Sequence, residues 1–193
     1  MKAMEKKILN EGKVFPGNIL KVGSFLNHQL DADFLMEVGR EIAELYNGEH
    51  IDKIVTIETS GVAVAFAAAA IMHVPVVYAK KHKSSNLSSD LYSAIVHSFT
   101  HNRDYTVYIS KEYLHEGERV LIVDDFLAVG NALNGLMDIV GQAKAEVVGM
   151  AVAIEKGFQG GGDSLRAKGI RVESMAIIDE MTDTDVIFRT QSK

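Results

Sequence analysis

Between residues 51 and 153 the sequence alternates short β-branched runs with segments of helical periodicity, which constrains the fold more than any other feature. The predicted strands are IVTIE (54–58), VVYA (76–79), VLIVDD (120–125) and VVGMAVAIE (147–155). One predicted helix begins at Gly61 and another runs through Val140. Such alternation is typical of a parallel sheet covered by helices on both faces. Uninterrupted apolar runs such as 120–123 fit strands buried on both sides, so we expect an α/β fold with a central, mostly parallel sheet.

The segments around this core predict further elements. An earlier helix is indicated by apolar residues at helical spacing, namely Phe34, Leu35, Val38, Ile42 and Leu45. Asp31 or Asp33 is expected to cap its start. The polar stretch 82–90 is expected to be a mobile loop leading into a hairpin that turns at 101–104, and GFQGGG (157–162) a flexible connection. IRVESMAII and DVIF predict two last strands, and the alanines after Gly61 are expected to pack closely on the sheet.

Composition narrows the class of protein. No linker or repeat divides the 193 residues, so we expect one domain, residues 1–193. The absence of cysteine excludes disulfides and thiolate metal sites and fits a cytoplasmic location. A net charge of −6 disfavours a nucleic-acid partner. The first residues lack the apolar core of a signal peptide, and the longest apolar stretch, 62–72, is about half of the ~20 residues that cross a bilayer, so no membrane is expected.

The segment VLIVDDFLAVGNA (120–132) carries the clearest chemical signal. A buried strand is expected to end in Asp124 and Asp125, and a loop of small residues then leads into a helix. Ligands bind at the carboxyl ends of strands in open parallel sheets, and backbone amides at a helix N-terminus can hold a phosphate. Two carboxylates, which only accept hydrogen bonds, suit the vicinal hydroxyls of a ribose. An isolated Asp pair would instead suggest a solvated turn, but this context favours a ribose 5-phosphate site.

This segment resembles the motif with which type I phosphoribosyltransferases bind phosphoribosyl pyrophosphate (PRPP). The chain also resembles the bacterial xanthine phosphoribosyltransferases throughout, in LKVGSFLNHQLD (20–31), TIETSG (56–61), YAKKHKS (78–84), DDFLAVGNA and IEKGFQ (154–159). The resemblance implies that the acidic pair binds the ribose. It further implies that the 5-phosphate lies on Ala128, Val129, Gly130, Asn131 and Ala132. The remaining PRPP contacts would come from Glu58, Thr59, Ser60, Gly61, Lys80 and Lys81.

The sequence departs from the family pattern at two places. The commoner loop carries Thr on either side of its glycine, whereas Val129 and Ala132 have no hydroxyl, so phosphate binding would rest on backbone donors and Asn131. After Phe158 and Gln159 the family often has Pro and Arg, and this chain has glycines instead. Lys80, Lys81 and Lys83 could also be a solubilising cluster, but their place after a core strand favours phosphate contact.

The residues expected around the base come from distant parts of the chain. Phe158 can stack on a planar ring, and Lys156 offers hydrogen-bond donors to a carbonyl-rich base. The resemblance adds Leu20 and Asn27 from the N-terminal segment. It implies a purine-salvage glycosyltransferase that converts PRPP and xanthine into xanthosine 5′-monophosphate and pyrophosphate.

The family also implies the surroundings of this site. We expect a small hood built from the N- and C-terminal segments, a lid at 82–94 that excludes water, and a homodimer. No histidine spacing indicates a metal site held by the protein alone, so Mg²⁺ is expected to bind through PRPP. Three alternatives remain: a transferase preferring guanine or hypoxanthine, a PRPP-sensing regulator of the same fold, and a nucleotide-binding module without catalysis.

Overall fold

The computed structural model describes residues 2–83, 90–98 and 103–190. Its main sheet contains β3 (Lys53–Ile57), β4 (Val76–Ala79), β7 (Arg119–Leu127), β8 (Glu146–Lys156), β9 (Val172–Met181) and β10 (Val186–Phe188). The strand order is β10-β9-β8-β7-β3-β4, and only β10 runs antiparallel to its neighbour. This confirms the mostly parallel sheet expected from the sequence. No helix of the described residues is long and apolar enough to cross a membrane.

The order of the strands creates a crevice in the middle of the sheet. From β3 the chain moves outward to β4, whereas from β7 it moves the opposite way to β8 and β9. The connections after β3 and β7 therefore leave in opposite directions, and ligands bind at such a switch point in open α/β sheets. The carboxyl ends of β3 and β7 are the expected location of a site.

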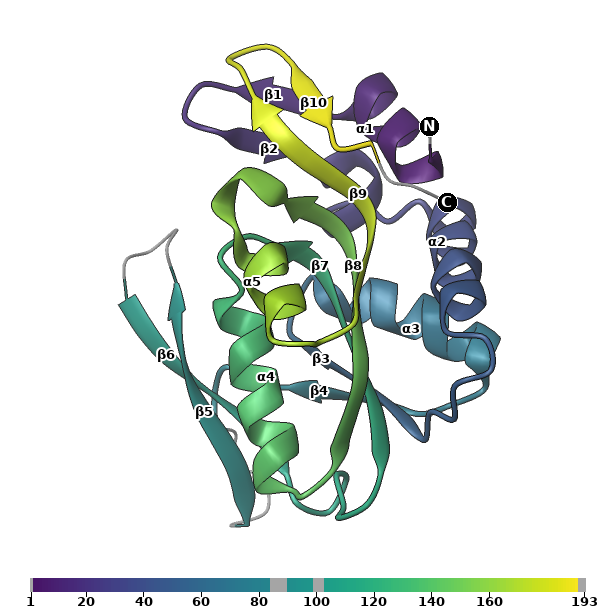
Figure 1. Cartoon of the computed structure of the whole chain (residues 1–193), viewed down its shortest axis with the longest axis vertical. Helices are drawn as coiled ribbons and strands as arrows, with labels where there is room; N and C mark the ends of the chain where they lie inside the picture. The colour runs from purple at the N-terminus through teal and green to yellow at the C-terminus, as the bar shows by residue number, and fades with distance from the viewer. Residues whose placement is uncertain (1, 84–89, 99–102, 191–193) are drawn as a thin grey trace.

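Helices cover both faces of this sheet (Figure 1). On one face lie α1 (Ala3–Glu11), α2 (Ala32–Leu45) and α3 (Gly61–Met72), and on the other lie α4 (Asn131–Gln142) and the hairpin of β5 (Leu91–Ser98) and β6 (Arg103–Ser110). In β7, Leu121 and Val123 face the first layer while Val120 and Ile122 face the second. Because successive strand residues point to opposite faces, an unbroken apolar run serves both cores.

Local signals explain the boundaries and packing of α2. Of the two candidate caps it is Asp31 that accepts a hydrogen bond, from the Phe34 amide at 3.1 Å. The alanines of α3 pack against α2 as well as against β3 and β7. A Cβ atom on Gly39 would lie 2.6 Å from the Ala67 carbonyl, so glycine allows the two helices to approach closely. The alanine-rich stretch is therefore a packing surface, as expected.

The prediction of a flexible connection at 157–162 is wrong. Residues Gly157–Gln159 form a 3-10 turn, η2, and Gly161–Ala167 form a helix, α5. Gly160, with φ of 74°, makes the break between them. The glycines that suggested flexibility are instead required because neighbouring atoms lie close. A Cβ on Gly162 would lie 2.1 Å from the Glu155 carboxylate.

Segments from the first and last parts of the described chain lie together at one end of the molecule (Figure 1). The hood at this end consists of α1, the hairpin of β1 (Lys13–Phe15) and β2 (Ile19–Lys21), and β10. A π-helical turn, η1 (Gly23–Asn27), follows β2. The sequence analysis missed α1, the β1–β2 hairpin and η1. The β5–β6 hairpin is confirmed, with Val96 paired to Tyr105. Residues 84–89 of the predicted lid and 101–102 of the predicted turn lie outside the described residues. The predictions are wrong for 91–94, which belong to β5, and for 103–104, which belong to β6.

Candidate active site

The acidic pair lies near the carboxyl end of β7, at the crevice. Asp124 is only 4% exposed and Asp125 is half-buried. The strand continues two residues further than predicted, since Phe126 pairs with Ile154 and Leu127 with Glu155 on β8. The Asp125 amide donates to Asp124 Oδ1 at 2.9 Å. The pair is thus held by the sheet itself and not by a turn that follows it.

The surroundings of Asp124 place its carboxylate against the start of α3. A Cβ on Gly61 would lie 2.5 Å from Asp124 Oδ1 and 2.4 Å from the Thr56 hydroxyl oxygen, so only glycine fits here. Burial raises the pKa of Asp124 well above its usual value, the charge of Asp125 adds to the rise, and Lys81 opposes it. Burial also raises the pKa of Asp125. Hydrogen bonds or a positive charge from a ligand would therefore stabilise the ionised form of both carboxyl groups.

The predicted phosphate loop lines a cavity of about 190 Å³ at the N-terminus of α4. All five loop residues contribute to this cavity, together with Val96, His97, Tyr105, Phe126, Leu127 and Leu133. Gly130, with φ of 89°, turns the chain into the helix. The first amides of a helix have no acceptor within it, so they can bind an anion. The Asn131 side-chain amide, however, donates to the His97 carbonyl at 3.0 Å instead of pointing freely into the loop.

The connection from β3 to α3 lies beside the acidic pair. It contains Glu58, Thr59 and Ser60, and the Glu58–Thr59 peptide bond is cis. The Lys81 amide donates to Glu58 Oε1 at 2.5 Å, which joins this connection to the end of β4. Lys81 is close enough to influence Asp124, whereas Lys80 lines a separate groove beside β4. The structure therefore brings one of the two predicted lysine side chains toward the acidic pair and turns the other away.

The predicted base contacts lie between the end of β8 and the hood. Lys156 Nζ donates to the Asn18 carbonyl, in the turn between β1 and β2, at 2.9 Å, and lies 6.0 Å from the Phe126 ring centroid. Burial lowers the pKa of Lys156. Asn27 Nδ2 lies 3.4 Å from Asp125 Oδ2 and so joins the hood to the acidic pair. Leu20 is buried and Phe158 is half-buried against the same core.

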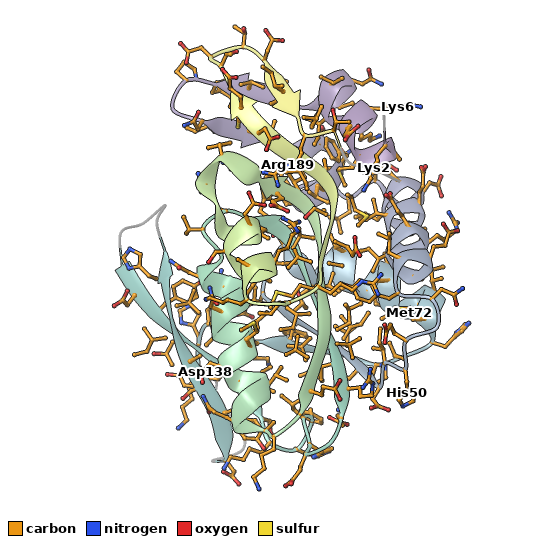
Figure 2. The ribbon with its side chains drawn as sticks, in the orientation of Figure 1. Lys2, Lys6, His50, Met72, Asp138 and Arg189 are labelled. Carbon is orange, nitrogen blue, oxygen red and sulfur yellow. The ribbon has the colours of Figure 1, made fainter. Side chains whose placement is uncertain are left out.

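One set of residues near this site was missed by the sequence analysis. Glu155, fully buried, accepts hydrogen bonds from both Arg166 terminal nitrogens, at 3.0 and 2.6 Å, and from the Ser174 hydroxyl. Arg189 extends the network by binding Asp163 and Asp179. Figure 2 shows Arg189 beside α5 and β9, at the opposite end of the sheet from His50. No local pattern predicts these pairs, because each joins separate elements.

The network fixes α5 against the site. A Cβ on Gly161 would lie 2.2 Å from the Ala128 carbonyl oxygen, and the Gly161 amide donates to that oxygen at 3.1 Å. Glu155 immediately precedes Lys156, so the same helix supports the phosphate loop and the end of β8. Among the described residues, no cluster of three or more His, Cys, Asp or Glu side chains could hold a metal ion.

Comparisons with known proteins agree with this geometry. Residues 27–182 match the phosphoribosyl transferase domain family. The chain is 55% identical over 190 residues to xanthine phosphoribosyltransferase 1 of Clostridium perfringens, covering 98% of this chain and 100% of that protein. It is 51% identical over 190 residues to the xanthine phosphoribosyltransferase of Clostridioides difficile, with the same coverage.

Solved structures share the fold. The adenine phosphoribosyltransferase of Giardia lamblia, in complex with 9-deazaadenine, superposes with a TM-score of 0.75 at 21% identity, covering 92% of this chain and 98% of that one. The Saccharomyces cerevisiae adenine phosphoribosyltransferase gives a TM-score of 0.72 at 21% identity, covering 90% and 98%. At this identity the likeness concerns the fold alone.

Proposed function

The chain belongs to the phosphoribosyl transferase domain family, and on that premise we propose that it transfers the ribose 5-phosphate unit of PRPP to xanthine, in purine salvage. The products are xanthosine 5′-monophosphate and pyrophosphate, which makes the enzyme a pentosyltransferase. The observation that carries the proposal is the identity of 55% over 190 residues, practically the whole chain, with a xanthine phosphoribosyltransferase. The buried acidic pair beside a helix N-terminus supports it independently, because this arrangement suits a ribose phosphate.

The PRPP contacts follow from the chemistry of each group. Asp124 and Asp125 accept hydrogen bonds from the two ribose hydroxyls, and the backbone amides of the loop 128–132 surround the 5-phosphate. Residues Glu58 to Gly61, with Lys81, face the pyrophosphate. Contact of Lys80 with PRPP stays a prediction; its backbone pairs with Tyr108 at 2.9 Å in both directions and so holds the lysine segment in place.

The base contacts favour xanthine for a chemical reason. Relative to hypoxanthine, xanthine carries a second carbonyl and loses a ring proton more readily. Lys156 offers hydrogen-bond donors to the second carbonyl and a positive charge to the deprotonated ring. Its half-buried position beneath the hood strengthens the interaction. Phe158 stacks on the ring, while Leu20 and Asn27 close the site from the N-terminal side.

In the proposed reaction, the bond from the ribose C1 to pyrophosphate breaks as the base attacks C1. Positive charge develops on the ribose, and the adjacent carboxylates stabilise it. Mg²⁺, which would be held mainly by PRPP near Asp124 and Asp125, would neutralise charge on the departing pyrophosphate. The protein orients the two reactants. Exclusion of water by the segment 82–94 stays a prediction, because residues 84–89 lie outside the described residues and 91–94 belong to β5.

A homodimer and a single domain spanning 1–193 complete the proposal. The dimer is supported by exposed apolar side chains, Leu30, Phe66 and Tyr78, around a groove of about 580 Å³ beside residues 58–60. Light scattering at micromolar concentration is expected to give twice the chain mass, and a monomer mass would contradict it. A cytoplasmic location remains a prediction.

The decisive experiment compares four bases. With PRPP and Mg²⁺, pyrophosphate release is measured with xanthine, guanine, hypoxanthine and adenine. We expect the highest kcat/KM with xanthine. A higher value with guanine or hypoxanthine would assign the protein to the alternative purine specificity. Binding of PRPP without pyrophosphate release from any base would indicate a sensor or a nucleotide-binding module.

A further inference from the structure

The phosphate loop is poor in side-chain donors. Val129 and Ala132 have no hydroxyl, and the Asn131 amide uses one of its two N–H groups on the His97 carbonyl at 3.0 Å. Backbone amides would then supply most of the hydrogen bonds to the 5-phosphate. A dianion with three acceptor oxygens can accept more hydrogen bonds than a short loop offers, so a donor from elsewhere in the cavity has a place to act.

Tyr105 lines the same cavity from a different element. It belongs to β6, where it pairs with Val96, and both residues line the cavity together with all five loop residues. Because strand residues alternate, Tyr105 shares its face with the buried Val107 and points toward the sheet and not to solvent. The Tyr105 side chain is half-buried, which leaves part of it open to the cavity.

The hairpin that carries Tyr105 is attached along the helix that carries the loop. At one end of α4, Gln142 Nε2 donates to the Ser93 carbonyl at 2.8 Å. In the middle, Gly135 makes room for Val96, since a Cβ there would lie 2.6 Å from Val96 Cγ2. At the other end, the Asn131 amide binds the His97 carbonyl. These contacts hold Tyr105 in a set position relative to the loop.

The phenol is in the correct state to donate. Burial raises the pKa of Tyr105, and the charge of Asp124 raises it further, so the hydroxyl stays protonated at neutral pH. It makes no hydrogen bond with any other residue that the structure describes. Lys81 Nζ lies 5.3 Å from the Tyr105 ring centroid, which places the ring between the phosphate loop and the segment proposed for pyrophosphate. The Tyr105 hydroxyl is not among the buried side-chain groups that lack a partner, so it is accessible and can donate to a phosphate bound in the cavity.

We propose that the hydroxyl of Tyr105 donates a hydrogen bond to the 5-phosphate of the substrate and replaces the side-chain donors that Val129 and Ala132 lack. The inference rests on the proposed function, because it assumes that the loop 128–132 holds this phosphate. Tyr105 is then a PRPP-binding residue contributed by the hairpin and not by the loop.

The test separates the two ends of PRPP. Binding of ribose 5-phosphate and of inorganic pyrophosphate is measured by calorimetry for the parent, for Tyr105→Phe and for Tyr113→Phe. Tyr113 is 53% exposed and lies outside the cavity, so it controls for the loss of a phenol. We expect Tyr105→Phe to bind ribose 5-phosphate about tenfold to a hundredfold more weakly, as for a lost hydrogen bond to a charged group. Its pyrophosphate affinity, and both affinities of Tyr113→Phe, should match the parent.

Restoring a hydroxyl to the loop gives a second measurement. Val129→Thr is nearly isosteric, so in the Tyr105→Phe background it should recover part of the ribose 5-phosphate affinity. Ribose 5-phosphate binding by Tyr105→Phe within twofold of a parent that turns over PRPP would overturn the inference, and so would equal weakening of pyrophosphate. A parent that releases no pyrophosphate from PRPP with any base would instead overturn the proposed function, and the inference with it.

Discussion

The two halves of the candidate site are built in different ways. The half proposed to bind ribose 5-phosphate is one continuous segment, the end of β7, the loop 128–132 and the start of α4, and its acidic pair is held by the central sheet. The half proposed to bind the base consists of residues from the hood and the end of β8, namely Leu20, Asn27, Lys156 and Phe158. Hydrogen bonds between distant residues, such as that from Lys156 to the Asn18 carbonyl, join it. Substitutions in the two halves should therefore affect different substrates.

One element touches both halves. Helix α5 presses Gly161 against the phosphate loop, while its Arg166 holds Glu155, the residue before Lys156. Because Glu155 is fully buried, its ion pair fixes the end of β8 firmly relative to α5. The two halves of the site are thus connected through α5 and, more weakly, through the contact between Asn27 and Asp125.

The largest effect is expected from replacing both Asp124 and Asp125 with Asn. Losing two charge-assisted hydrogen bonds of roughly 1.5–3 kcal/mol each should lower kcat/KM for PRPP about 100- to 10,000-fold. The fold should not weaken at neutral pH. A carboxyl with a raised folded-state pKa stabilises the fold when protonated, and that stability is lost as the pH rises through its pKa, whereas Asn stays neutral.

Steady-state kinetics and thermal unfolding at pH 7 check this prediction. Asp138→Asn is a matched control, because Asp138 is exposed on α4 (Figure 2) and should change neither measurement. Unaltered kinetics in the double variant would refute the assigned role of the pair.

Lys156→Met should produce the next largest effect, and only on the base. The variant keeps most of the side-chain length but loses the charge and the donors, so xanthine recognition should weaken by about 1.5–3 kcal/mol, or roughly tenfold to a hundredfold in kcat/KM. The KM for PRPP should stay within twofold. Lys168→Met, at an exposed position after α5, is the control. If efficiency with xanthine stayed within twofold of the parent, another residue would have to read the base.

Gly161→Ala should instead weaken PRPP binding, in the half of the site that contains the phosphate loop. The added Cβ would meet the Ala128 carbonyl oxygen at 2.2 Å, so the loop must shift. Overpacking of this kind costs about 1–3 kcal/mol, and we expect roughly a tenfold rise in the KM for PRPP. Gly141→Ala is the control, because nothing lies within 4 Å of the Cβ built there. A rise in the KM for xanthine alone would show that α5 supports only the base half.

Asn27→Ala should have the smallest effect, spread over both substrates. Its contact with Asp125 is long, at 3.4 Å, so its loss should cost about fivefold or less in kcat/KM. The Asn27 amide lowers the pKa of Asp125, against the larger rise caused by burial. Without it the Asp125 carboxylate protonates at a higher pH, and the acidic limb of the pH profile of kcat/KM should shift upward. An unshifted limb would mean that Asn27 does not influence the acidic pair.

The sequence predicted those features of this protein that depend on residues close to one another along the chain. The alternation of β3, α3 and β4, and then of β7, α4 and β8, follows from apolar periodicity, and the Asp31 cap follows from a short polar side chain before a helix. The segment 120–132 could be interpreted because strand, acidic pair, loop and helix follow one another along the chain. Asp124 and the loop remain neighbours in space for the same reason.

Other features depend on contacts that no local pattern encodes. The glycines at 160–162 predicted a flexible connection, but they are small because the phosphate loop and Glu155 lie against α5. Likewise, neither the pairing of Arg166 with Glu155 nor the place of Tyr105 in the cavity beside the loop follows from spacing along the chain. Periodicity reports which face of an element is buried, whereas the partner buried against it is chosen by the packing of the whole fold.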